Sequence, residues 1–226
     1  MSSSIIIQQP QGPAQQLMLL YHGFGASPAD MTPVGQRLAQ EFPNAFIVSV
    51  QATDLSEVGA GYQWFGARGV TEENRPERVA QAMPDFIASI EHWQQTTGVE
   101  ATATAIVGFS QGAIMALEAT QQEKILAGRV IALAGRFAQL PRPISTDITV
   151  HFLHGKEDSV IHYGYCVTAA EHLVKQGSDI TADILPFLDH SISTEMQDLI
   201  IERLKGHIPK RHWEEVLKAS EVEKNQ

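Results

Sequence analysis

Apolar segments of strand-like character alternate with helix-like segments along most of the chain. The predicted strands cover residues 16–21, 45–50, 102–109, 129–134, 148–154 and 180–185. The predicted helices cover residues 31–41, 77–96, 111–121, 162–175 and 194–205, with a short one at 213–219. Strands that are joined by helices need crossover connections, and these produce parallel sheet. The alternation therefore predicts an α/β fold with a mostly parallel central sheet and helices on both faces.

The length and composition are typical of a single globular domain. A chain of 226 residues can bury a sizeable core, and neither an internal repeat nor a low-complexity linker marks a boundary. Hydrophobic residues make up 43% of the chain, yet no apolar run approaches the roughly 20 residues that span a bilayer. The amino-terminal segment lacks a basic leader, and its isoleucines from Ile5 to Ile7 are typical of a strand. We expect residues 1–226 to form one domain of a cytoplasmic protein.

Charge, cysteine content and histidine spacing exclude several classes of function. A net charge of -10 opposes binding to nucleic acid and to anionic membrane surfaces. Cys166 is the only cysteine, which excludes an intrachain disulfide and a Cys-x-x-Cys redox pair. His151 and His154 lie three positions apart on a predicted strand, so their side chains face opposite sides and should not share a metal ion. We expect no metal and no cofactor, and leave the oligomeric state open.

The segment Gly108-Phe109-Ser110-Gln111-Gly112 joins a predicted strand to a predicted helix. A Gly-x-Ser-x-Gly sequence in this context is typical of a sharp turn that exposes a nucleophilic serine, with small residues at both flanking positions where two backbones crowd together. The pattern therefore predicts that Ser110 is a catalytic nucleophile. The simpler interpretation is a glycine-rich helix entry in which the serine is a local cap.

Two further strand ends carry the partners that such a serine needs. Asp158 follows the strand at 148–154, and His190 follows the strand at 180–185. Because the carboxyl ends of parallel strands meet at one edge, we expect His190 to act as general base and Asp158 to orient it. Glu157 is the alternative acid, whereas Asp189 is interpreted as a loop or capping residue.

A small-residue turn at residues 22–26 follows the first long strand. The oxyanion of a tetrahedral intermediate needs two backbone N–H donors, for which we predict Gln111 and Phe24. The alternative is a glycine-rich loop that merely turns the chain. In the long irregular segment between residues 51 and 76, Trp64 and Phe65 are expected to line a substrate pocket, and packing against the core is the alternative.

With these motifs assembled, the chain resembles the carboxylesterase and acyl-protein thioesterase branch of the α/β-hydrolases. The matching motifs are His22-Gly23-Phe24-Gly25, Trp64-Phe65, Gly108-Phe109-Ser110-Gln111-Gly112, His154-Gly155-x-x-Asp158 and Asp189-His190. The resemblance implies the α/β-hydrolase fold, a triad of Ser110, Asp158 and His190, and ester hydrolysis without a cofactor. Many members of the branch have glycine where this chain has Ala113, which weakens the transfer of a specific thioester substrate.

The sequence leaves two classes of function open. The first is a serine hydrolase that cleaves carboxylic esters, or thioesters, of small soluble molecules through an acyl-enzyme. Within this class a lysophospholipase, an acyl-protein thioesterase or a peptidase is an alternative, although no long apolar lid segment favours a lipid substrate. The second class is a non-catalytic ligand-binding protein on the same scaffold.

Overall fold

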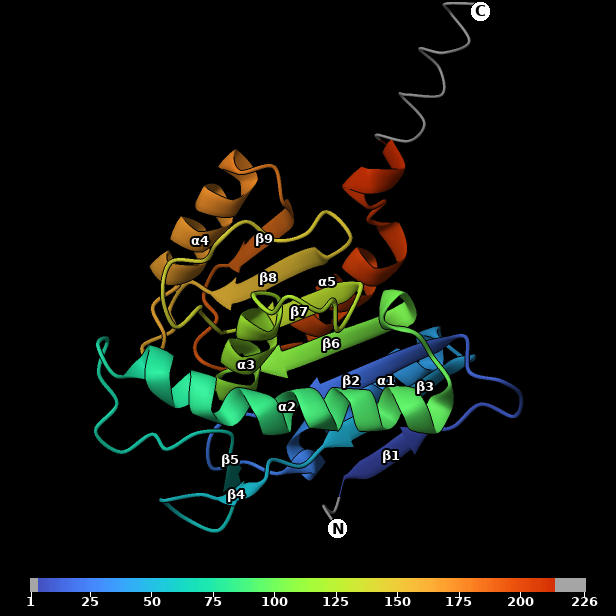
Figure 1. Cartoon of the computed structure of the whole chain (residues 1–226), viewed down its shortest axis with the longest axis horizontal. Helices are drawn as coiled ribbons and strands as arrows, with labels where there is room; N and C mark the ends of the chain where they lie inside the picture. Colours follow the sequence, from blue (N-terminus) through green and yellow to red (C-terminus); the bar gives the residue numbers. More distant parts are fainter. Residues whose placement is uncertain (1–3, 214–226) are drawn as a thin grey trace, which may run out of the picture.

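The computed structural model describes residues 4–213 and contains a seven-stranded sheet with the order β1-β3-β2-β6-β7-β8-β9. The strands are β1 (Ile5–Gln8), β2 (Gln16–Tyr21), β3 (Ala45–Val50), β6 (Thr104–Phe109), β7 (Arg129–Leu133), β8 (Thr149–Gly155) and β9 (Asp179–Leu185). β1 is antiparallel to β3, and the other neighbouring pairs are parallel. The arrowheads of the parallel strands point to one side of the molecule, so their carboxyl ends form one edge (Figure 1). The predicted mostly parallel sheet is confirmed.

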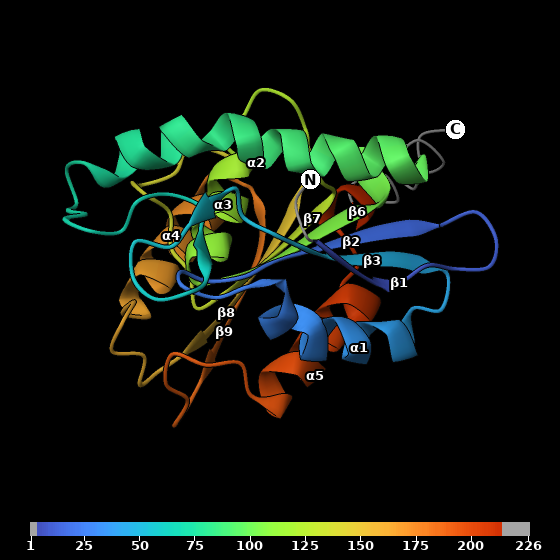
Figure 2. The same cartoon turned by 90° about the horizontal axis from the view of Figure 1, so that it is seen from below.

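Helices cover both faces of this sheet, as the sequence predicts. Figure 2 shows α2 (Arg75–Thr97), α3 (Gln111–Ala119) and α4 (Gly164–Lys175) on one face, and α1 (Thr32–Glu41) and α5 (Thr194–Gly206) on the other. Each face has its own cluster of buried apolar side chains. The central strands contribute alternate residues to the two clusters, which is why β2 is apolar at five of its six positions, all five of them buried.

The long helix α2 shows how the sequence pattern produces this packing. Its buried side chains are Val79, Met83, Phe86 and Ile90, whose spacing of three and four residues places them on one side of the helix. Gly98 follows the last turn with a φ of 71°, a left-handed conformation that glycine adopts without strain. The apolar stripe therefore fixes which side of α2 lies on the sheet.

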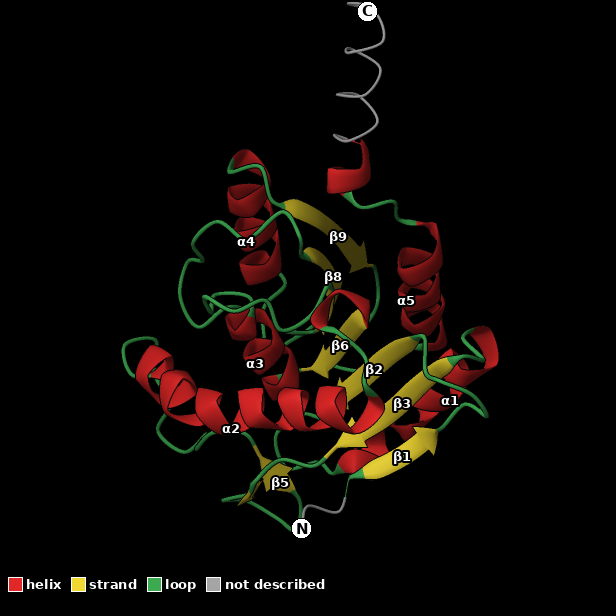
Figure 3. Ribbon diagram, turned by 45° about the vertical axis from the view of Figure 1, so that its right-hand side comes forward, coloured by secondary structure: helices red, strands yellow, loops and turns green. Residues whose placement is uncertain are grey.

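The segment from residue 51 to residue 74 is mostly irregular and lies outside the main sheet (Figure 3). It contains only the short antiparallel pair β4 (Asp54–Leu55) and β5 (Tyr62–Gln63). Two single turns of 3-10 helix, Pro28–Met31 and Ala101–Ala103, lie outside these elements, and residues 210–213 are also helical. Of the predicted helix at 213–219, all but Trp213 lies outside the described residues. Within residues 4–213, none of the helices is long and apolar enough to cross a membrane.

Candidate active site

Ser110 connects β6 to α3 through a strained turn. Its φ of 51° lies in the left-handed region that non-glycine residues seldom adopt, and its backbone N–H donates to the Leu133 carbonyl at 2.9 Å. A Cβ on Gly108 would lie 2.5 Å from the Gly112 carbonyl oxygen, and a Cβ on Gly112 would lie 2.3 Å from the Tyr21 carbonyl oxygen. No side chain fits at either position. The structure therefore forms the strand–turn–helix geometry that exposes a serine hydroxyl.

The hydroxyl of Ser110 lies at one end of a continuous hydrogen-bonded chain. His190 Nε2 is 2.9 Å from Ser110 Oγ, and His190 Nδ1 is 2.7 Å from Asp158 Oδ2. Because an ionised carboxylate only accepts hydrogen bonds, the Nδ1 atom carries the proton and Nε2 accepts from the serine. These three predicted residues come from the loops after β6, β8 and β9. Glu157, the alternative acid, is exposed.

Asp158 is 3% exposed and has donors on both carboxylate oxygens. Its Oδ1 accepts the backbone N–H groups of Val160 and Ile161, each at 2.8 Å, while Oδ2 accepts from His190. Burial alone would raise the pKa of Asp158, but the hydrogen bonds from His190, Ile161 and Val160 outweigh it and hold the pKa below its ordinary value. The carboxylate is therefore ionised at neutral pH and holds the imidazole in one tautomer.

Comparison with known proteins identifies the family of the chain. A model of the phospholipase/carboxylesterase family matches residues 3–208. The chain belongs to this family. It has the α/β-hydrolase fold and is a hydrolase of the carboxylesterase type, which confirms the resemblance seen in the sequence.

Individual members of the phospholipase/carboxylesterase family and related structures cover most of the chain. Esterase YpfH of Escherichia coli (strain K12) is 46% identical over 212 residues, which is 94% of this chain and 91% of that protein. Acyl-protein thioesterase 1 of Cryptococcus neoformans is 27% identical, over 70% of this chain and 73% of its own. The crystal structure of esterase PE8 superposes with a TM-score of 0.81 and 24% identity, over 92% of this chain and 99% of that one. This last similarity supports the fold alone.

A second buried histidine contacts the acid of the candidate triad. His154 is 1% exposed, and its Nε2 atom lies 2.7 Å from the Ile161 carbonyl oxygen and 3.1 Å from Asp158 Oδ2. Both neighbours are acceptors, so Nε2 carries the proton, and burial lowers the pKa of His154 and keeps its imidazole neutral. In the sequence, His154 is interpreted as a member of the family motif and as an unfavourable candidate metal ligand, not as a contact of the acid. The spacing His154-Gly155-x-x-Asp158 is the only sequence pattern that links the two residues. It does not reveal that the turn after β8 brings the Asp158 carboxylate back to the His154 side chain.

The turn after β2 lies directly against the serine. A Cβ on Gly23 would lie 3.3 Å from Ser110 Cβ, and the Gly25 N–H, two residues further on, donates to the Tyr62 carbonyl at 2.9 Å. Phe24 lies between these two glycines. Gln111 is the first residue of α3, a position whose backbone N–H has no acceptor within the helix. Both predicted oxyanion donors are thus on segments that border Ser110, and their role stays a prediction.

The Gln111 side chain has a contact that the sequence does not reveal. Its amide oxygen accepts from the backbone N–H of Trp64 at 2.8 Å, and its amide nitrogen donates to the Phe65 carbonyl at 2.7 Å. The Gln111 side chain therefore joins the irregular segment to the start of α3. The Trp64 ring packs in the core, 5.2 Å from the Tyr21 ring and 5.4 Å from the Phe86 ring. Trp64 and Phe65 are both buried. These contacts favour the core-packing interpretation for Trp64, and a role for either ring in a substrate pocket stays a prediction.

The one departure from the family pattern near the turn has a local structural explanation. Ala113, where many members have glycine, is fully buried. It faces Gly135, on which a Cβ would lie 2.4 Å from the Ala113 Cβ. The methyl group of Ala113 therefore fits because the opposite residue has none.

The two histidines of β8, His151 and His154, have different neighbours. His151 Nδ1 lies 2.8 Å from Thr181 Oγ1, and burial lowers the pKa of His151 to about 3. The His151 ring lies against the ring of His207, whereas His154 contacts Asp158. Within residues 4–213, no group of three or more His, Cys, Asp or Glu side chains is placed to hold a metal ion.

Proposed function

We propose that the protein is a serine hydrolase that cleaves carboxylic esters, and thioesters in a secondary role, through an acyl-enzyme. The observation that carries the proposal is the unbroken contact from Ser110 Oγ through His190 to Asp158, with distances of 2.9 and 2.7 Å. Family membership supports ester cleavage, and so does the 46% identity to Esterase YpfH over 94% of the chain.

The first half of the reaction forms the acyl-enzyme. Ser110 Oγ attacks the carbonyl carbon while its proton moves to His190 Nε2, and Asp158 stabilises the resulting imidazolium. The backbone N–H groups of Gln111 and Phe24 stabilise the oxyanion, and a preorganised donor of this kind lowers the barrier by about 2.7–4 kcal/mol. When the intermediate collapses, the carbon–oxygen bond of the ester breaks and His190 gives its proton to the leaving alcohol.

The second half releases the acid. Water attacks the acyl carbonyl of the ester on Ser110, and its proton moves to His190 Nε2. Collapse of this second intermediate returns the proton to Ser110 Oγ, and the carboxylic acid departs. The enzyme recovers its starting state, so the cycle needs no cofactor.

A substrate series tests this proposal against its alternatives. We expect 4-nitrophenyl esters of short acyl chains to be hydrolysed faster than the matching acyl-CoA thioesters and faster than lysophospholipid. A preference for thioesters would favour the acyl-protein thioesterase alternative. A folded protein that hydrolyses none of these substrates and is not labelled by a fluorophosphonate would support a ligand-binding protein. A cytoplasmic location stays a prediction from the sequence.

His154 provides a test of how Asp158 is held. Loss of a donor to a buried charged group costs roughly 1.5–3 kcal/mol, so His154→Phe should lower kcat by about 10- to 100-fold with little change in KM. His154→Gln retains an N–H near the position of Nε2 and should recover most of the lost kcat. Steady-state kinetics on a short 4-nitrophenyl ester measures both variants. Equal losses of kcat in the two variants, or a loss confined to KM, would contradict a role in positioning Asp158.

A further inference from the structure

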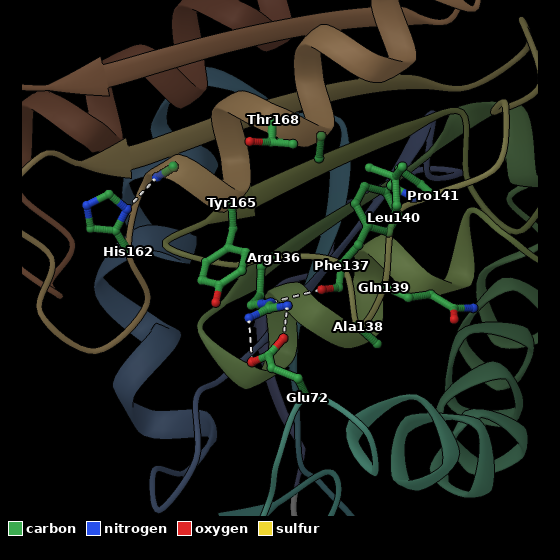
Figure 4. A pocket seen from close by; sticks show the side chains of 12 residues that line it. Glu72, Arg136, Phe137, Ala138, Gln139, Leu140, Pro141, His162, Tyr165 and Thr168 are labelled. Carbon is green, nitrogen blue, oxygen red and sulfur yellow. Dashed lines mark hydrogen bonds and ion pairs between the residues drawn. The ribbon is translucent and has the colours of Figure 1, made fainter.

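A cavity of about 690 Å³ opens at the carboxyl edge of the sheet and has no assigned role. Its walls come from the segment after β7, from the loop before α4 with the first turns of that helix, and from Glu72 (Figure 4). Phe137, Leu140 and Pro141 give it an apolar side. Arg136 and Glu72 give it a charged end, so the cavity combines the two features of a site for an amphipathic small molecule.

The charged end is built around a buried arginine. The Arg136 side chain is 9% exposed, and its Nε donates to the Phe137 carbonyl at 3.0 Å. Its guanidinium carbon lies 3.5 Å from the centroid of the Tyr165 ring, so the ring covers one face of the group. The two remaining nitrogens, Nη1 and Nη2, bind the two oxygens of Glu72 at 3.0 and 2.7 Å. Arg136 is therefore held rigidly and presents a fork that fits a carboxylate.

Glu72 differs from Arg136 in how it is held. Its side chain is 56% exposed and comes from the irregular segment before α2. Arg136 is the main cause and Arg75 the second cause of the lowered pKa of Glu72, so the carboxylate is ionised. An anionic partner stabilises a buried cation, and the carboxylate of a bound ligand could replace that of Glu72. Another carboxylate can displace Glu72 into solvent and leave Arg136 paired.

The cavity lies at the same edge of the sheet as the candidate nucleophile, although the side chains of the triad do not line it. The Ser110 N–H donates to the Leu133 carbonyl, and Arg136 follows Leu133 by only three residues, a span of at most about 10 Å. Between them, Gly135 packs on Ala113 in the first turn of α3. A second wall residue, His162, belongs to the loop whose backbone binds Asp158. The cavity and the candidate nucleophile therefore share one edge of the sheet, and a substrate attacked by Ser110 needs a chain long enough to extend into the cavity.

We propose that this cavity binds the free carboxylate of an ester substrate on Arg136, and that Glu72 occupies that position when no substrate is bound. The substrate class is a half-ester of an aliphatic dicarboxylic acid, whose methylene chain lies along Phe137, Leu140 and Pro141. The inference rests on the proposed ester hydrolysis for its kinetic consequence, but the anion site itself is defined by Arg136 and the cavity.

The kinetic test compares two matched ester series. One series consists of mono-4-nitrophenyl esters of succinate, adipate, suberate and sebacate, and the other carries a carboxamide in place of the free carboxylate. In Glu72→Gln, which weakens the internal competitor, the ratio of kcat/KM for the carboxylate ester to that for the carboxamide ester should rise about tenfold at the best chain length. Adding Arg136→Gln should abolish this rise.

Glu73→Gln is the matched control because it removes the same charge from the neighbouring position, and it should leave the ratio within about twofold of the wild type. An equal ratio in wild type and Glu72→Gln at every chain length would overturn the proposal, since Glu72 would then be a fixed structural partner. Should Arg136→Gln not fold, Arg136→Lys replaces it, because lysine keeps the charge but cannot bind both carboxylate oxygens. The comparison of Glu72→Gln with Glu73→Gln tests the proposal without either variant of Arg136.

A binding measurement separates this inference from the proposed function. Calorimetric titration of Ser110→Ala/Glu72→Gln should give a Kd for octanoate about tenfold lower than for octanamide, and adding Arg136→Lys should remove the difference. A protein that shows this difference but hydrolyses neither ester series would keep the anion site and refute ester hydrolysis. A protein that hydrolyses the esters but binds octanoate and octanamide equally would refute the anion site.

Discussion

Ser110→Ala should lower kcat for 4-nitrophenyl esters by about 10⁴- to 10⁶-fold, because every later step depends on the acyl group carried by this oxygen. The hydroxyl is exposed by a strained turn, with a φ of 51°, and lies 2.9 Å from His190 Nε2. Alanine keeps the Cβ, so the turn should fold as before. The measurements are steady-state kinetics and stoichiometric labelling with a fluorophosphonate, which should disappear in Ser110→Ala.

The matched control for this variant is Ser191→Ala. Ser191 lies beside His190 in sequence, but its Oγ donates to Asp189 Oδ1 at 2.5 Å rather than to the triad. This variant should retain labelling and stay within a few-fold of the wild-type kcat. Full labelling of a folded Ser110→Ala protein would show that another residue is the nucleophile, and the proposed mechanism would be wrong.

The sequence predicts the location of functional side chains that follow the ends of strands. Ser110, Asp158 and His190 are far apart in the chain, yet each follows an apolar segment that becomes β6, β8 or β9. Because parallel strands share one carboxyl edge, the order of segments alone predicts that these side chains meet. His151 and His154 lie three positions apart on one strand, so the sequence also predicts that their side chains face opposite sides. In the structure the two side chains have different contacts.

The sequence does not predict contacts made by long side chains between loops. Arg136 and Glu72 are 64 residues apart and form a paired fork. The Gln111 amide reaches Trp64 across 47 residues. No periodicity or strand order links such positions, because the irregular segment at residues 51–74 has neither. The cavity beside Arg136 therefore depends on loop packing that the sequence does not predict.

Asp158→Asn should lower kcat by about 10⁴-fold while leaving KM and the fold nearly unchanged. The reason is the set of donors around the carboxylate: Oδ1 accepts from the backbone N–H groups of Val160 and Ile161, and Oδ2 faces His190 Nδ1 and His154 Nε2. An asparagine keeps its carbonyl oxygen on the two backbone donors and turns its NH₂ group toward His190, while the His154 Nε2–H keeps the Ile161 carbonyl as its acceptor. Steady-state kinetics at neutral pH and the thermal midpoint measure the two expectations.

An NH₂ group at this position requires an acceptor on His190 Nδ1, so the proton of the neutral imidazole moves to Nε2. That atom then faces Ser110 Oγ as a donor and cannot take the serine proton, which is why replacing one carboxylate oxygen by an NH₂ group should have so large an effect on kcat. Glu157→Gln is the matched control, because Glu157 is the neighbouring acid but is exposed, and it should keep wild-type kcat within a few-fold. If Asp158→Asn instead retained kcat within tenfold of the wild type, the carboxylate would not set the tautomer of His190, and Asp158 would have only a structural role.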